Sequence, residues 1–184
     1  MKEKTQDKTK ELYMDNYCEQ LVGKVRTGAD YVKMGGIGTA AVLLAAVFMF
    51  FAMIFGFYSL TILAVLSLFG GVWLLGGMNV EYEYIVTNNE MDIDKITGKR
   101  KRKRMITVDL SNAEDFIPFG TDNTAADATV HASSGVEKDA YCLLVNHSSY
   151  GMVKVVFNPN EKLREAIMQE VPGQLRMKIR NNGQ

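Results

Sequence analysis

Residues 34–80 read MGGIGTAAVLLAAVFMFFAMIFGFYSLTILAVLSLFGGVWLLGGMNV, and this stretch decides the fold because its 47 residues include no Asp, Glu, Lys or Arg. Lys33 precedes the stretch and Glu81 follows it. One helix needs about 20 residues to cross a bilayer core of about 30 Å, so the run is long enough for two crossings. The sequence therefore predicts a hairpin of two transmembrane helices over residues 34–80.

A turn is predicted at residues 56–59, where Gly, Phe, Tyr and Ser interrupt the aliphatic run. The first helix is then expected over residues 37–55 and the second over residues 60–78. A turn this short makes the two helices antiparallel neighbours. Neither span contains an ionisable side chain, and this is evidence against an ion or proton pathway through the hairpin.

The basic residues that flank the hairpin predict its orientation. Lys24, Arg26 and Lys33 precede the first helix, and Lys95 and the basic run 99–104 follow the second, whereas the turn carries no basic residue. Cytoplasmic flanks of membrane helices are enriched in Lys and Arg. We therefore expect a two-pass protein of the cell membrane with both termini in the cytoplasm.

Small residues recur at four-residue spacing along the first predicted helix, in the pairs Gly36 and Ala40, Ala41 and Ala45, and Ala52 and Gly56. Faces of this kind let helix backbones approach closely. Two interpretations follow. The face packs within the hairpin, which we favour, or it joins copies of the chain into a homo-oligomer.

The segments around the hairpin divide the rest of the chain into three parts. Residues 1–33 are predicted to be a cytoplasmic tail with an amphipathic helix between Lys10 and Met34, which lies on the inner leaflet or packs on the chain's own soluble domain. Residues 81–173 are long enough for one soluble domain. Residues 174–184 are basic and are expected to be a flexible tail.

After the hairpin the apolar pattern changes to a period of two, which predicts strands over residues 80–87, 91–96 and 99–110. Burial of Ile93 beside Ile106 requires a loop with an even number of residues between the last two strands. The same register places Asp92 and Asp94 on the face that carries the lysines of residues 99–103. Arg102 then borders the apolar face.

Further strands are predicted at residues 139–146 and 152–157, and a final helix follows them. Asn158 is the expected N-cap of that helix, with Pro159 at its first position and Glu161 completing a capping box. Leu163 belongs to its apolar stripe, and residues 171–173 end it.

The basic run is the main candidate for a binding site, and it consists of Lys99, Arg100, Lys101, Arg102, Lys103 and Arg104. A basic residue near a membrane gains about 1 kcal/mol against anionic lipid, although the nearby aspartates would cancel part of that gain. The run therefore has three interpretations: a solvated strand kept from aggregating by its charge, a surface for anionic lipid headgroups, or a surface for an acidic partner.

Composition and motifs give no support for other functional classes. The chain has 21 basic and 21 acidic residues, so no nucleic-acid partner is expected. His131 and His147 lie in different segments, as do Cys18 and Cys142, and none has the spacing of a metal site. No catalytic or cofactor-binding motif is present. We expect no metal, no cofactor and no enzymatic activity.

Three stretches resemble a family of uncharacterised small bacterial membrane proteins, namely residues 82–96, the following run 98–104 and residues 156–161. That family carries a pleckstrin-homology-like (PH-like) domain behind a two-helix membrane hairpin. The resemblance implies a membrane α-hairpin plus an α+β soluble domain, which forms a partly open, seven-stranded β-barrel capped by the C-terminal helix. It implies no catalytic residues and a location in the bacterial cell membrane.

Two functions are consistent with these observations. The first is a membrane-anchored interaction module that binds a protein partner or anionic lipid at the cytoplasmic face. The alternative is a structural subunit of a larger membrane complex that assembles through the transmembrane hairpin.

Overall fold

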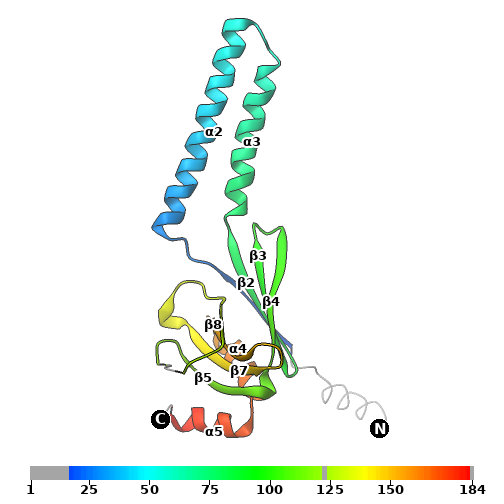
Figure 1. Cartoon of the computed structure of the whole chain (residues 1–184), viewed down its shortest axis with the longest axis vertical. Helices are drawn as coiled ribbons and strands as arrows, with labels where there is room; N and C mark the ends of the chain where they lie inside the picture. Colours follow the sequence, from blue (N-terminus) through cyan, green and yellow to red (C-terminus); the bar gives the residue numbers. More distant parts are fainter. Residues whose placement is uncertain (1–16, 122–123, 183–184) are drawn as a thin grey trace, which may run out of the picture. The chain divides into compact units, whose positions relative to one another are not determined.

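The computed structural model describes residues 17–121 and 124–182, and the chain forms two compact units (Figure 1). The helical unit comprises residues 24–80 and 97–101. The second unit, called the β unit here, comprises the described parts of residues 1–23, 81–96 and 102–184.

The helical unit contains the two predicted helices, α2 (Gly28–Phe55) and α3 (Leu60–Gly77). Both are long and apolar enough to cross a membrane, and most of their side chains are exposed. Helix α2 begins earlier than predicted because Thr27 and Asp30 form a capping box, in which Thr27 N donates to Asp30 Oδ2 at 2.9 Å. It ends at Gly56, whose φ of +66° suits a glycine C-cap.

Small residues form the contact between α2 and α3, which Figure 1 shows side by side. Ala45, Ala52 and Ala64 are buried there, and a Cβ atom added to Gly71 would lie only 2.6 Å from the Cβ of Ala41. Three of the predicted small residues of α2 therefore pack within the hairpin, as the favoured interpretation expects. Gly36 and Ala40 remain exposed.

Residues 17–23 form a strand, so the amphipathic helix predicted between Lys10 and Met34 is wrong there, whereas its residues from Gly28 onward belong to α2. Strand β1 (Tyr17–Gly23) pairs antiparallel with β2 (Val80–Thr87), with Cys18 opposite Val86. Exposed and covered side chains alternate along β1, which is the period of a strand rather than of a helix. The helical hairpin is thus inserted between two neighbouring strands of one sheet. Residues 10–16 of the predicted helix lie outside the described residues.

The described strands form two open four-stranded sheets. The first sheet has the order β1-β2-β3-β4, with β3 (Glu90–Thr97) and β4 (Lys101–Asp109). The second has the order β5-β7-β8-β6, with β5 (Ala113–Pro118), β6 (Ala128–His131), β7 (Tyr141–His147) and β8 (Gly151–Phe157). Short 3-10 turns η1 (Leu110–Asn112) and η2 (Glu137–Asp139) lie in the connections. The described strands number eight, not the seven that the resemblance implies.

Aromatic side chains of both sheets meet in the core of the β unit. Tyr84 of β2 packs edge-on against Phe157 of β8, with ring centroids 5.4 Å apart. The Tyr84 hydroxyl donates to the carbonyl oxygen of Ala132 at 2.5 Å, so this buried polar atom is satisfied. Leu143 and Ile167 are fully buried in the same unit.

Helix α4 (Glu161–Glu170) is capped by Asn160, not by Asn158 as predicted. Asn160 Oδ1 accepts from the backbone N–H of Leu163 at 2.8 Å. Asn158 is buried instead, where its side chain accepts from Ser134 N at 2.7 Å and donates to Val136 O at 2.9 Å. Its amide is therefore occupied by the loop before η2 and is not available to a helix end.

A second C-terminal helix, α5 (Gly173–Asn182), occupies most of the predicted flexible tail, so that prediction is wrong through residue 182. Leu175 of this helix is buried, and Lys178 forms an ion pair with Asp115 of β5 at 2.8 Å. These two contacts hold α5 on the β unit.

The cap and the apolar face of α4 give a stability prediction. Asn160→Ala should lower the free energy of unfolding by about 1 kcal/mol through loss of the cap. Leu163→Ala should lower it by about 2–5 kcal/mol because Leu163 is fully buried. The chain's two cysteines, Cys18 and Cys142, are buried in the β unit. Their thiols become reactive when the β unit unfolds, so thiol labelling of the full-length protein at increasing urea concentration measures this unfolding. Equal losses in the two variants would contradict this packing.

Candidate functional site

The basic run forms the turn between β3 and β4 and the start of β4. Gly98 and Lys99 have φ values of +62° and +57°, and Arg100 N donates to Thr97 O at 3.2 Å. Two successive residues with positive φ define the tight turn that matches the twist of a β-hairpin. The turn has two central residues, Gly98 and Lys99, and residues 98–100 separate the ends of β3 and β4, so the even-numbered loop stays a prediction.

Arg100 fixes this turn to the end of α3 within the helical unit. Its guanidinium carbon lies 5.1 Å from the centre of the Trp73 ring, and its Nη2 donates to the Trp73 carbonyl oxygen at 3.0 Å. Gly98 N donates to Asn79 O at 2.7 Å, and a Cβ atom at Gly98 would lie 3.0 Å from Gly76 O. The last turn of α3 has no basic residue of its own, so Arg100 supplies the positive charge that a helix C-terminus favours.

A groove of about 460 Å³ lies beside this contact, in the same unit. Its walls are mostly apolar, and the residues that line it include Ile37, Trp73, Leu74, Met78, Arg100 and Lys101. The groove thus combines an apolar body with two cationic side chains. Trp73 is not among the residues predicted from the sequence, although it is the chain's one tryptophan and lies near the end of the uncharged run.

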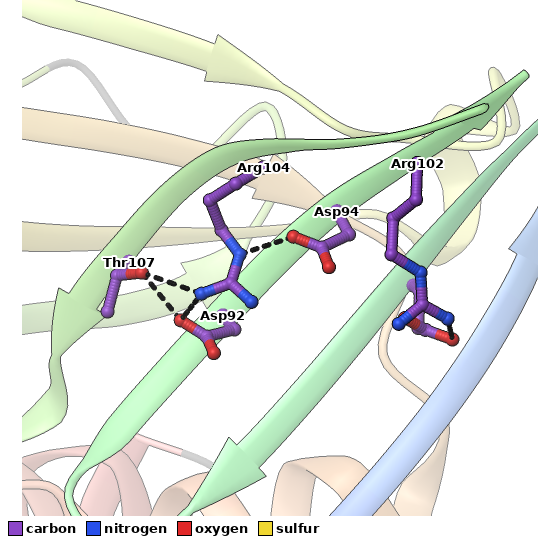
Figure 2. Close-up of polar contacts among 6 residues, drawn as sticks. Asp92, Asp94, Arg102, Arg104 and Thr107 are labelled. Atoms are coloured by element: carbon purple, nitrogen blue, oxygen red, sulfur yellow. Dashed lines mark hydrogen bonds and ion pairs between the residues drawn. The ribbon is translucent and has the colours of Figure 1, made fainter.

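Arg104 is held by two aspartates of β3, as Figure 2 shows. Its Nη1 lies 2.5 Å from Asp92 Oδ1, and its Nε donates to Asp94, which is buried. Thr107 joins the cluster, because its hydroxyl donates to Asp92 at 2.5 Å and accepts from Arg104 Nη1 at 3.1 Å. The positive charge of Arg104 is therefore neutralised within the sheet.

Arg102 is paired with Glu83 of β2, through a contact of 2.7 Å between Nη2 and Oε1. The Glu83 side chain is only 5% exposed. Burial raises the pKa of the Glu83 carboxyl, and the charge of Arg102 acts in the opposite direction. The second oxygen, Oε2, is buried without a hydrogen-bond partner among the described residues, so Arg102 is the main compensation for this carboxylate.

The predicted division of charges between the faces of β4 is wrong in two respects. Asp92 and Asp94 contact Arg104 rather than the lysines, and Arg102 contacts Glu83 rather than bordering the apolar face. The prediction assumed an unbroken alternation of faces. Arg104 and Thr107 both contact Asp92, although they are three residues apart. In a regular strand with a period of two, residues three apart point to opposite faces.

The three lysines of the run differ from its arginines. Lys99, Lys101 and Lys103 are exposed, and within the described part of the chain none of them forms an ion pair or a side-chain hydrogen bond. Of the six predicted site residues, the three arginines hold the β3–β4 hairpin in place and the three lysines remain exposed.

The other residues considered from the sequence are not gathered into one site. Among residues 17–121 and 124–182, no group of three or more His, Cys, Asp and Glu side chains is placed to hold a metal ion. Cys18 and Cys142 are buried and form no disulfide, and the ring of His147 packs against Tyr150 with centroids 4.9 Å apart.

Comparison with known families gives a match that covers most of the chain. A family model described as bacterial PH-like domain (DUF6106) matches residues 14–177. The matched region includes β1, the helical hairpin and both sheets. No curated protein and no solved structure matches the chain.

The different roles of neighbouring basic residues predict different effects on stability. Arg104→Gln should lower the free energy of unfolding by about 1–3 kcal/mol, because it leaves the buried carboxylate of Asp94 without its cation. Lys103→Gln should change the free energy of unfolding by no more than about 0.5 kcal/mol, because Lys103 is exposed and has no ion-pair partner in residues 17–121 and 124–182. Urea-dependent labelling of the two buried cysteines measures the free energy of unfolding of both variants. A loss of similar size in both variants would contradict the assignment.

Proposed function

Because the chain belongs to the bacterial PH-like domain family, we propose that it is a membrane-anchored, non-enzymatic interaction module whose β3–β4 turn binds anionic lipid headgroups at the cytoplasmic face. In this proposal α2 and α3 cross the bilayer. Their length, their apolar composition and their exposed side chains support this role.

The observation that carries the proposal is the contact of Arg100 with Trp73. It fixes the basic turn at the end of α3, and tryptophan is enriched where membrane helices meet the headgroups. Lys99 and Lys101 belong to the same unit and are unpaired among the described residues. Each contributes about 1 kcal/mol against an anionic surface. Arg102 and Arg104 are paired with carboxylates, and Arg100 contacts Trp73. The attraction to anionic lipid therefore comes from the lysines and not from all six residues of the run.

We also infer that the β unit is the partly open barrel implied by the resemblance, closed by α4. Two features support this finer assignment. Tyr84 and Phe157 join the two sheets. Gln20 of β1 bonds to the segment just before α4, donating to Asn158 O at 2.9 Å and accepting from Asn160 N at 2.8 Å.

The alternative function is a structural subunit that assembles through the hairpin. Gly36 and Ala40 favour it, because they are small, lie on α2 and are left outside the contact with α3. This alternative does not require the lysines to contact lipid, so the lipid experiment below separates the two functions.

The orientation in this proposal predicts which side of the membrane each flank occupies. A cysteine in place of Tyr58, in the exposed turn, should react with a membrane-impermeant maleimide added to intact cells. A cysteine in place of Val25, which is exposed before α2, should react only after the membrane is permeabilised. The parent chain is the control, since both of its cysteines are buried. Labelling of Val25→Cys in intact cells would overturn the orientation.

Trp73 is the chain's one tryptophan, so its fluorescence can report which lipids gather at the basic turn. The full-length protein is placed in nanodiscs that contain an equal mole fraction of brominated phosphatidylglycerol or of brominated phosphatidylcholine. The anionic lipid should quench Trp73 more strongly, because each lysine raises the local concentration of anionic headgroups about fivefold at about 1 kcal/mol. Added salt should reduce the difference, since charges are screened over about 8 Å at physiological ionic strength.

The double variant Lys99→Gln and Lys101→Gln should bring the two lipids close to equal quenching. The matched control is Lys138→Gln with Lys162→Gln, which removes the same charge from exposed positions of the β unit and should keep the preference. Equal quenching by the two lipids in the parent protein at low salt would overturn the lipid proposal and leave the alternative function.

A further inference from the structure

A second cavity lies wholly within the β unit, beside β5, β7, α4 and α5. Its volume is about 330 Å³, and its walls are mainly apolar, formed by Phe116, Ile117, Pro118, Tyr141, Met168 and Ile179. Pockets of a few hundred cubic ångströms with apolar walls and few polar groups are typical of small-molecule sites. Its polar lining residues are Asp115, Arg164 and Lys178.

The two cationic side chains of this cavity, Lys178 and Arg164, differ in whether a carboxylate neutralises their charge. Lys178 Nζ is 2.8 Å from Asp115 Oδ2, so its charge is neutralised. Arg164 has no carboxylate partner within the described residues. Its Nη1 donates to the Tyr141 hydroxyl at 2.7 Å, and its guanidinium carbon lies 5.2 Å from the centre of the Tyr141 ring.

Arg164 also carries an unused donor. Its Nε is buried and has no hydrogen-bond partner among the described residues. A buried donor on a charged group is costly unless an acceptor reaches it, and an anionic acceptor gives the stronger bond. The Tyr141 hydroxyl accepts from Arg164, so its own proton remains able to donate. One unneutralised positive charge and two neighbouring donors suit the two oxygens of a single carboxylate.

The volume limits the rest of the ligand. One water molecule takes about 30 Å³ in the liquid, so a cavity of about 330 Å³ has the volume of about eleven waters. This corresponds to a ligand of about ten to twelve non-hydrogen atoms. We propose that this cavity is a binding site for a medium-chain aliphatic carboxylate, with its carboxylate on Arg164 and Tyr141 and its chain against Phe116, Met168 and Ile179. The site is independent of the lipid contact proposed for the β3–β4 turn.

The test uses carboxyl-labelled decanoate and the full-length protein in nanodiscs, with empty nanodiscs as the reference for partitioning into lipid. Decanoate should bind saturably, with one molecule per chain, above that reference. Decanamide has the same chain length without the charge, and it should bind about 10- to 100-fold more weakly because the charged hydrogen bonds are lost.

Three variants locate the site. Arg164→Gln should weaken decanoate binding about 10- to 100-fold, and Ile179→Trp should block the chain without removing a charge. Lys162→Gln is the matched control on α4, where Lys162 is exposed, and it should bind like the parent. Protection of Cys18 and Cys142 from labelling verifies that each variant is folded.

Several outcomes would overturn the proposal. They are binding by the parent no greater than that of empty nanodiscs, equal binding of decanamide and decanoate, and unchanged binding by folded Arg164→Gln. Loss of the Trp73 lipid preference in the earlier experiment has no bearing on this site, because the two sites share no residue.

Discussion

The pairing of β1 with β2 is the constraint on which the rest of the structure depends. The chain leaves the first sheet after Gly23 and returns to it at Val80, and Lys24 N donates to Val80 O at 2.9 Å where the two segments separate. An inserted segment that starts and ends at neighbouring strands must turn back on itself, which a pair of antiparallel helices does. A cut at residue 80 would remove β1 and expose the edge of β2.

Electrostatics divides the basic run by residue type. The guanidinium group of arginine is planar, and its several N–H donors suit carboxylates, aromatic rings and carbonyl groups. The three arginines of the run use these contacts to hold the β3–β4 hairpin. Lysine is a flexible point charge, and the three lysines remain exposed. The same six residues thus serve two purposes, with the arginines giving the turn a fixed position and the lysines giving it an unneutralised charge.

The two proposed binding sites follow one physical argument. At the β3–β4 turn and at the Arg164 cavity, cations beside an apolar surface have no carboxylate partner among the residues that the structure describes. An amphiphile with an anionic head is complementary to that arrangement. The sites differ in their surroundings, because the turn packs on α3 whereas the cavity is lined by strands and the C-terminal helices of the β unit.

The sequence by itself determined the two long apolar helices and their short turn, because a run of 47 uncharged residues leaves few other structures. It also determined β2, the β3–β4 hairpin with its tight turn, and a helix after β8, because strand alternation, turn residues and an apolar stripe are local signals. It located the basic run as the candidate site.

Only the tertiary structure decided β1, since its partner lies about sixty residues further along the chain and a seven-residue pattern is compatible with more than one element. It also decided which of two asparagines caps α4, because Asn158 is taken by a distant loop. The partners of the arginines, the contact of Arg100 with Trp73 and the open donor of Arg164 depend on segments brought together by folding. Such non-local contacts leave no periodic pattern in the sequence, and so they could not be predicted from it.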